Sequence, residues 1–175
     1  MSIIKISKPD PEEYASNYAG YIDEVKGDDL VAALEGGSEN LLSFIRAIPA
    51  DKLDYRYQEG KWTIKEIIIH HMDVERIFCY RALRFSRNDS TALSGFDDDD
   101  YVAESNASER TLSGILDEYT ALRRSTIELF KNITDMMSRR SGIANGKELS
   151  VRALGYIIVG HEIHHLDVIR TKYLK

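Results

Sequence analysis

The sequence predicts an all-α fold on three observations. Proline is confined to the first third of the chain, so the later long segments lack the residue that breaks helices most strongly. Those segments place apolar residues at intervals of three and four, the spacing of a helix that faces a bundle core. The sequence also lacks a convincing run of alternating apolar and polar residues bounded by hairpin turns, which is the pattern that indicates a strand.

Length and composition favour one globular domain. The 175 residues fit a single domain over 1–175, in which we expect residues 1–20 to form an N-terminal arm. A hydrophobic fraction of 43% with 30% charged residues argues against intrinsic disorder. The net charge of −6 argues against a general nucleic-acid binder, which needs Lys and Arg to neutralise phosphates.

Other features favour a cytoplasmic protein. Cys79 has no second cysteine to pair with, as expected in a reducing compartment. The first residues lack the apolar stretch of a signal peptide. No segment approaches the roughly 20 apolar residues of a membrane span. We therefore expect no membrane contact.

The first third of the chain predicts short helices and one bundle helix. Residues 11–35 are typical of short helices, and we expect Gly36 and Gly37 to interrupt them. A first bundle helix is predicted over about 38–47, ending before the next proline. The polar segment 50–61 predicts a loop.

The second helix has the clearest start. Thr63 and Glu66 form the sequence pattern of a capping box, in which each side chain binds the backbone N–H of the other residue. We expect this helix to end near residue 87 and a loop to occupy 88–94. A third, broken helical region is predicted over about 97–132, with a restart near Ser108 and Glu109.

The last helix is predicted over about 150–173, after a loop at 141–146. Its core-facing positions follow a 3-4-3-4 spacing. Two of these positions hold histidine instead of an aliphatic residue. The stripe consists of Val151, Leu154, Ile158, His161, His165 and then Val168 or Ile169.

The histidines carry the main chemical signal. All five fall in two clusters: His70 and His71, then His161, His164 and His165. Residues four apart lie on one face of a helix, so His161 and His165 can bind one metal ion together. The other cluster can supply a third ligand, and periodicity alone does not choose between its two histidines. The pattern predicts a divalent metal site.

The segment from His161 to His165 also matches the H-E-x-x-H pattern of zinc proteases, in which Glu162 would activate water. The extended form of that motif needs glycine at position 168 and histidine at position 171. The sequence has Val168 and Thr171 there, so a protease is disfavoured.

Several segments resemble one known family. GKWTIKEIIIHHMDVER at Gly60–Arg76 resembles the W-[ST]-x-x-E-x-x-x-H-x-x-D-x-E-R signature of the DinB/YfiT-like superfamily. Residues 95–102 look like the family's middle segment. Residues 145–152 and 160–165 look like its last helix. The resemblance spans about 20–173.

The resemblance implies a four-helix bundle with one long crossover and a metal site of His70, His161 and His165. It also implies a small-molecule substrate, a Zn or Ni ion and a homodimer. Characterised relatives are bacillithiol or glutathione S-transferases and a mycothiol-dependent maleylpyruvate isomerase, and many others are called metal-dependent hydrolases. The family therefore implies a transferase that uses a low-molecular-weight thiol, or a hydrolase. A non-enzymatic stress or binding protein stabilised by its metal is the alternative.

Other residues near these motifs have two interpretations. We expect His71 and His164 to be surface histidines rather than groups behind the ligands. Asp73 and Glu75 could orient a ligand imidazole, but their spacing favours a charge on the helix surface or between helices. Trp62 is expected to pack at the base of the bundle.

Three arginines, the aspartate run and the cysteine also have two interpretations each. Arg76, Arg81 and Arg84 either hold a carboxylate-bearing thiol or pair with acidic side chains. We expect the aspartates at 97–100 to cap a helix rather than to bind calcium. Cys79 is expected to be buried and inert.

Overall fold

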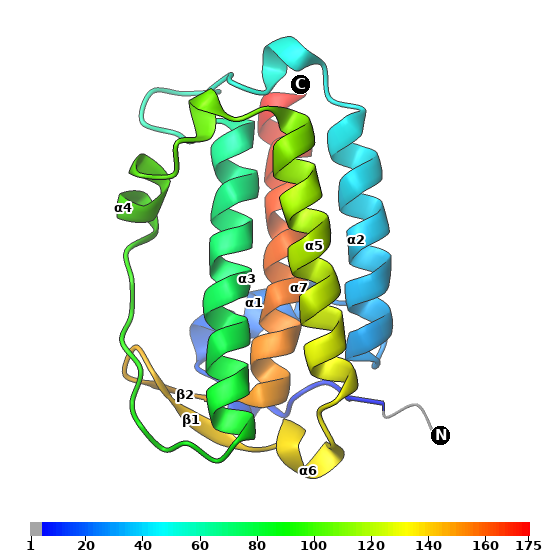
Figure 1. Cartoon of the computed structure of the whole chain (residues 1–175), viewed down its shortest axis with the longest axis vertical. Coiled ribbons are helices and arrows are strands. Elements are labelled where there is room, and N and C mark those ends of the chain that lie inside the picture. Colours follow the sequence, from blue (N-terminus) through cyan, green and yellow to red (C-terminus); the bar gives the residue numbers. More distant parts are fainter. Residues whose placement is uncertain (1–4) are drawn as a thin grey trace.

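The structure of the chain, a computed structural model, describes residues 5–175. Four long helices lie side by side and form a bundle (Figure 1). This arrangement confirms the predicted all-α fold and the four-helix bundle. The bundle helices are α2 (Leu30–Arg46), α3 (Ile64–Ser86), α5 (Leu112–Lys131) and α7 (Val151–Val168).

The order of the helices requires one long connection. α2 and α7 run in one direction along the bundle, whereas α3 and α5 both run in the other (Figure 1). The chain must therefore return along the full length of the bundle between α3 and α5. This crossover carries the short helix α4 (Asp98–Ala103) and the 3-10 turn η4 (Ala107–Glu109), so the predicted region 97–132 is broken as expected.

Short helices precede the bundle, as predicted. They are the 3-10 turns η1 (Pro11–Glu13) and η2 (Ser16–Tyr18), followed by α1 (Ala19–Glu24). α1 packs closely on α7, because Gly160 lacks a Cβ. A Cβ at Gly160 would lie 1.9 Å from the carbonyl oxygen of Tyr21.

Two predicted helix starts are confirmed. The Oγ1 of Thr63 accepts from the backbone N–H of Glu66 at 3.2 Å, and the Glu66 carboxylate accepts from the N–H of Thr63 at 2.6 Å. Asp97 caps α4 by accepting from the N–H groups of Asp99 and Asp100. Only Asp97 of the aspartate run serves as this cap.

The prediction that Gly36 and Gly37 interrupt the first helices was wrong. α2 runs through both glycines and begins at Leu30 instead of near residue 38. The Asp29 carboxylate caps its start. Each glycine costs a helix about 1 kcal/mol. Burial of apolar side chains on both sides outweighs that cost; these are Leu30, Val31, Leu34, Leu41 and Ile45.

The loop predicted at 141–146 is instead part of a hairpin. Strands β1 (Ser141–Ala144) and β2 (Lys147–Ser150) pair antiparallel. Asn145 and Gly146 join them with φ angles of 50° and 70°. Two left-handed residues in a two-residue connection make a type I′ turn, for which Asn-Gly is the preferred sequence. The dipeptide was the signal for this hairpin.

Three further segments differ from the prediction in detail. The last helix is α-helical only to Val168 and continues as a π-helical turn, η5 (Ile169–Tyr173). The predicted loop 50–61 contains a 3-10 turn, η3 (Ala50–Lys52), and α6 (Asp135–Ser138) precedes the hairpin. Among the helices within 5–175, none has both the length and the apolar character to cross a bilayer.

The core is divided into two apolar clusters. The lower cluster, near the start of α2 in Figure 1, includes Leu34, Val74, Phe130 and Ile158. The upper cluster includes Leu41, Ile67, Tyr119 and Leu166. Each of these sets has one residue from each bundle helix. Buried polar side chains lie between the two clusters, and we call them the polar layer: His71, Glu75, Arg123 and Glu162.

Candidate metal centre

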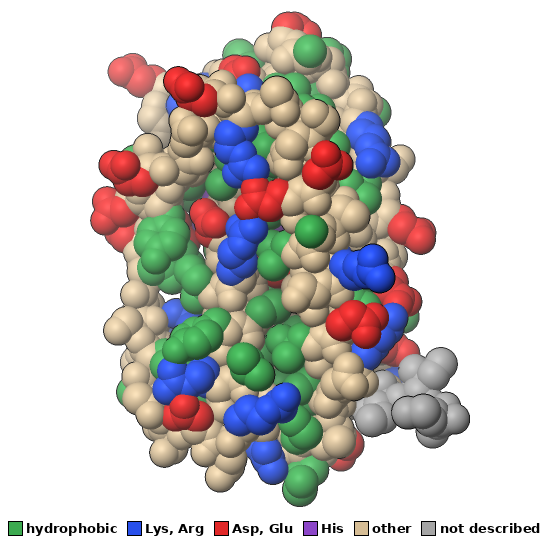
Figure 2. Space-filling model, in the orientation of Figure 1, with side chains coloured by type: hydrophobic (Ala, Val, Ile, Leu, Met, Phe, Trp, Pro, Cys, Tyr) green, Lys and Arg blue, Asp and Glu red, His purple; other side chains and the backbone are tan. Residues whose placement is uncertain are grey.

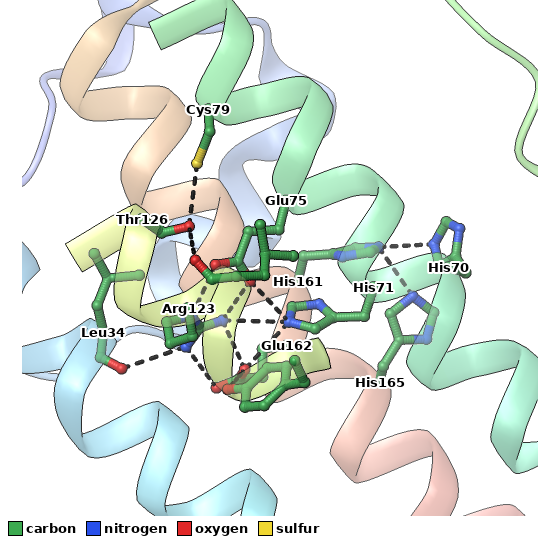
Figure 3. A network of polar contacts seen from close by, with 12 residues as sticks. Leu34, His70, His71, Glu75, Cys79, Arg123, Thr126, His161, Glu162 and His165 are labelled. Atoms are coloured by element: carbon green, nitrogen blue, oxygen red, sulfur yellow. Dashed lines mark hydrogen bonds and ion pairs between the residues drawn. The ribbon is translucent and has the colours of Figure 1, made fainter. Parts of the chain in front are cut away.

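Three histidines from two helices converge beside the polar layer (Figure 3). The Nε2 atom of His161 in α7 lies 3.1 Å from Nε2 of His70 in α3. It lies 2.9 Å from Nε2 of His165, one turn further along α7. One ligand atom from each of the three lies within 4.8 Å of the others. The structure thus places His70, and not His71, in the cluster.

The arrangement fits a metal ion better than hydrogen bonding. A neutral imidazole nitrogen offers either one lone pair or one proton. His161 Nε2 faces two ring nitrogens, so hydrogen bonding satisfies at most one of them. A single cation satisfies all three lone pairs. Zn–N bonds of about 2.0–2.1 Å would hold two tetrahedral ligands roughly 3.4 Å apart, close to the observed spacing.

Burial keeps these imidazoles in the form that binds a metal. It lowers the pKa of His70 to about 4 and that of His165 to about 2, with neighbouring histidines adding to the effect. The pKa of His161 is also lowered well below its usual value by burial. Metal ligation requires the neutral imidazole, so the cluster is prepared for it at neutral pH.

The crossover brings an acidic group to the cluster. The Oδ1 of Asp98 lies 3.7 Å from Nδ1 of His70. Sequence reasoning assigned the aspartate run to helix capping alone and missed this contact. The signal available was the run itself, because one cap uses only one aspartate.

Aromatic rings cover the clustered histidines. The Trp62 ring lies 4.6 Å from that of His70, centroid to centroid, and its Nε1 donates to Asp99 at 3.0 Å. Trp62 packs on the upper apolar cluster beside the start of α3, at one end of the bundle as expected, and it also packs against the site. Tyr21 contacts His161 and His164 edge-on, each at 5.5 Å. His164 is exposed, as predicted.

The polar layer holds a buried network of charges (Figure 3). The Arg123 guanidinium donates two hydrogen bonds of 2.9 Å to Glu75 and one of 2.8 Å to Glu162. The hydroxyl of Tyr119 donates to Glu162 at 2.8 Å. His71 Nε2 lies 3.2 Å from Glu162. All four bundle helices contribute to the network, because Arg123 of α5 also donates to a backbone carbonyl of α2.

The contacts of α3 correct the expectation for His71 and decide between the alternatives for Glu75 and Asp73. His71 was predicted to be on the surface, but it is only 2% exposed and contacts the charges of the polar layer. Glu75 pairs with Arg123 of α5 and contacts His71, so it carries a charge between helices, as its spacing favours, and orients none of the three clustered histidines. Asp73 pairs with Arg76 on the outside of α3.

The Glu162 carboxylate does not have the surroundings of the residue that activates water in a zinc protease. Burial alone would raise its pKa, but Arg123 and His71 lower that pKa to about 2. Its oxygens face Arg123, Tyr119 and His71. The carboxylate is thus already engaged in the polar layer, which agrees with the sequence argument against a protease.

The remaining sequence candidates fall into two groups. The Sγ of Cys79 lies 3.3 Å from Thr126 Oγ1, and burial raises the pKa of its thiol to about 12, in agreement with the expectation that it is inert. The side chain is half-buried rather than fully buried. The three arginines of α3 form no common basic surface. Arg76 and Arg84 pair with acidic side chains, whereas Arg81 is buried.

Two cavities open beside the histidine cluster. The first has a volume of about 150 Å³, and its lining includes Tyr21, Val74, Arg81, Asp98 and His161. The second has a volume of about 310 Å³, and its lining includes Trp62, Asp99, His164, His165 and Tyr173. Each cavity therefore reaches at least one of the three clustered histidines.

Comparison with known proteins identifies the family. No curated protein matches the chain. Among solved structures, the chain is similar to YfiT from Bacillus subtilis, with 18% identity, a TM-score of 0.72 and coverage of 94% of this chain and 93% of that one. YfiT is described as a probable metal-dependent hydrolase with an unusual four-helix bundle topology. The model of the DinB superfamily matches residues 33–169, well over half of the sequence, and the chain belongs to that superfamily.

Proposed function

We propose that this protein is a divalent-metal-dependent enzyme that acts on a small molecule, either as a thiol S-transferase or as a hydrolase. The observation that carries the proposal is the convergence of three imidazole Nε2 atoms at a point reached by two cavities. His70, His161 and His165 would hold the ion, for which Zn or Ni is the best match to three imidazoles.

The residues around the cluster support this chemistry. Three protein ligands leave a coordination position open, as in catalytic rather than structural sites. A bound ion would lower the pKa of a thiol or a water molecule in that position. The negative charge of Asp98 favours a proton on Nδ1 of His70, which leaves the Nε2 lone pair free. The Trp62 ring shields His70 from water.

The two cavities favour the transferase over the hydrolase. A transferase must place two molecules beside one centre, whereas a hydrolase needs room for one molecule and water. The first cavity reaches His161 and the second reaches His165, so two different molecules would meet at the cluster. We therefore propose a low-molecular-weight thiol as one of the two.

A second candidate function is that of a non-enzymatic stress or binding protein that uses the metal to stabilise its fold. The engagement of Glu162 favours it, because the carboxylate next to His161 is occupied by Arg123 and Tyr119. The acidic group that contacts the cluster itself, Asp98, lies beside Nδ1 of His70 rather than beside the three Nε2 atoms.

We further propose a cytoplasmic homodimer without nucleic-acid contact. Lys and Arg are interspersed with Asp and Glu on the face shown in Figure 2. Such a mixture offers no continuous basic surface there. Exposed apolar side chains on α3 and β1, including Tyr80, Leu83 and Ile143, are available for contact between subunits. Light scattering of the purified protein measures its oligomeric state.

Metal content tests the site directly. We expect mass spectrometry to find about one ion per chain in the purified protein, and almost none in the H70A and H161A variants. The matched control is H164A, which removes an exposed histidine of the same segment and should keep its ion. Failure to bind ions even after incubation with Zn²⁺ or Ni²⁺, or retention of the ion in both ligand variants, would contradict the proposal.

Activity then separates the two candidate functions. The loaded and the chelated protein are compared on pairs of a thiol and an electrophile, and on hydrolysable esters and amides. Turnover that is lost on chelation, with the helical fold retained, supports the enzyme. A large fall in melting temperature on chelation, without turnover on any pair, supports the stress or binding protein.

A further inference from the structure

Arg81 is a buried guanidinium without a carboxylate partner among residues 5–175. Its side chain is only 3% exposed. The other two buried arginines differ from it, because Arg123 and Arg152 each pair with two carboxylates. A guanidinium has five N–H donors. In the part of the chain that the structure describes, Arg81 gives one hydrogen bond, to the carbonyl oxygen of Ser94 at 3.0 Å.

Arg81 lies in the wall of the cavity that reaches the metal centre. It is held between two aromatic rings, 5.1 Å from the centroid of Phe78 and 5.9 Å from that of Phe96. The same cavity is lined by His161 and Asp98. The cavity is thus lined by a cation, Arg81, and by one histidine of the cluster, His161.

We propose that Arg81 binds the carboxylate of a small, flat, largely apolar substrate whose reacting end faces the histidine cluster. The placement of the reacting end at the cluster rests on the proposed metal-dependent function, whereas the binding of the carboxylate by Arg81 does not. A planar guanidinium matches a carboxylate through two parallel hydrogen bonds. Burial makes such a pair stronger than it would be in water, and an unpaired buried cation is unfavourable.

The size and the walls of the cavity define the substrate class. A volume of about 150 Å³ is that of a cavity that holds benzene. Apart from Arg81, Asp98, Asn145 and His161, the lining side chains are apolar or aromatic, and they include Val74, Phe78, Phe96 and Ile157. Asp98 lies beside His70 and repels an anion. A substrate carboxylate is therefore directed to Arg81.

The crossover and the hairpin fix the part of the cavity beside Arg81. Ser94 and Phe96, which contact Arg81, belong to the crossover. Leu93 N donates to the carbonyl of Ile143 at 2.9 Å, and Asn145 N donates to the carbonyl of Leu93 at 3.0 Å. Arg81 is thus positioned before a ligand binds, which lowers the entropic cost of binding.

A titration with two matched probes tests the proposal on the metal-free protein. Benzoate and its neutral analogue benzamide are titrated and followed by amide chemical shifts in NMR. We expect benzoate to bind with a Kd at least about tenfold lower than that of benzamide. Arg81→Met, which removes the charge but keeps the length, should abolish the preference. Arg84→Met, which removes a half-buried arginine three residues away that pairs with Asp89, should leave it unchanged.

Two further variants keep the test decisive if Arg81→Met does not fold. Arg81→Lys keeps the charge but not the paired donors, and should lower the preference. Ile157→Phe fills the cavity from the α7 side, and should weaken binding of both probes. Equal affinities of the two probes for the wild type, an unchanged preference in Arg81→Lys, or a preference that survives Arg81→Met would overturn the proposal.

The same titration separates this proposal from the metal-dependent function. If benzoate binds the metal-free protein through Arg81 and no ion ever binds, the anion site stands and the metal function fails. If benzoate binds only the metal-loaded protein and Arg81→Met has no effect, the anion binds the ion. Arg81 then has no role in binding, and the metal function stands.

Discussion

Arg123 lies at the centre of the bundle with its guanidinium against the carboxylates of Glu75 and Glu162. The two acidic residues belong to α3 and α7, so one side chain neutralises charges from two other helices. Burial tends to lower the pKa of Arg123, but both carboxylates raise it well above its usual value. The residue is therefore a permanent cation on which two buried anions depend.

Removal of this cation should be costly. In Arg123→Met the packing volume is largely kept, but two buried carboxylates lose their neutralising partner. We expect the free energy of unfolding to fall by about 3–5 kcal/mol, the usual effect of breaking a buried ion pair. Urea denaturation followed by circular dichroism measures this change.

A surface pair provides the control for Arg123. Arg139 pairs with Asp135 in solvent, and Arg139→Ala should change the free energy of unfolding by about 1 kcal/mol or less. A loss in Arg123→Met no larger than that of Arg139→Ala would show that the polar layer is not held by this charge.

The spacing of side chains along a helix explains which site residues could be predicted. His161 and His165 were identifiable because four residues bring a side chain back to the same face. Arg123 was not, since its partner Glu75 is separated from it by 48 residues in sequence. Periodicity gives the face of a helix, but not the partner across the bundle. The choice of His70 over His71 needed the family motif for the same reason.

Within α2, two neighbouring glycines have different surroundings. A Cβ at Gly36 would meet no atom within 4 Å, and the residue is exposed. A Cβ at Gly37 would lie 2.5 Å from Oε1 of Glu162. That carboxylate cannot move freely, because Arg123 and Tyr119 hold it. Gly37 therefore makes room for the polar layer, whereas Gly36 has no such role.

The same substitution should have opposite effects at these positions. Gly36→Ala should raise the free energy of unfolding by about 0.5–1 kcal/mol, because alanine favours the helix. Gly37→Ala should lower it by about 1–3 kcal/mol through overpacking against Glu162. Chemical denaturation of both variants measures the difference. Stabilisation by Gly37→Ala would mean that Glu162 is free to move.

The glycines and the hairpin show where prediction of the elements fails. Capping patterns located the starts of α3 and α4, because a cap is a local interaction. Gly36 and Gly37 misled the prediction, since the packing of α2 against α5 and α7 overrides the weak preference of two residues. The hairpin was missed because its strands are only four residues each. Neither strand shows the alternation of a longer one.

Across the whole chain, the N-terminal segment is bound to the last bundle helix. Arg152 at the start of α7 pairs with Asp10 and Glu13 and donates to Ser7 at 2.9 Å. The all-α class followed from residue patterns, whereas the crossover and the bundle topology came from the family resemblance. Contacts such as Arg152–Glu13, 139 residues apart in sequence, leave no local signal.

The Glu13 contact makes stability depend on pH. Burial would raise the pKa of Glu13, but hydrogen bonds from Arg152 and its other neighbours lower it from 4.5 to about 2. A carboxyl with a lowered pKa stabilises the fold above its unfolded pKa, and that stability is lost as the pH falls from about 4.5 toward 2. Glu13→Gln should therefore be less stable than the wild type at pH 7.

The difference between the two proteins should shrink as the pH is lowered through that range. Urea denaturation at pH 7, 5, 4 and 3 measures it. The matched control is Glu12→Gln, which changes an exposed neighbour that has no hydrogen bond or ion pair with residues 5–175. Glu12→Gln should follow the wild type at every pH. A constant difference between Glu13→Gln and the wild type from pH 7 to 3 would show that ionised Glu13 does not anchor the N-terminal segment, and that packing alone holds it on α7.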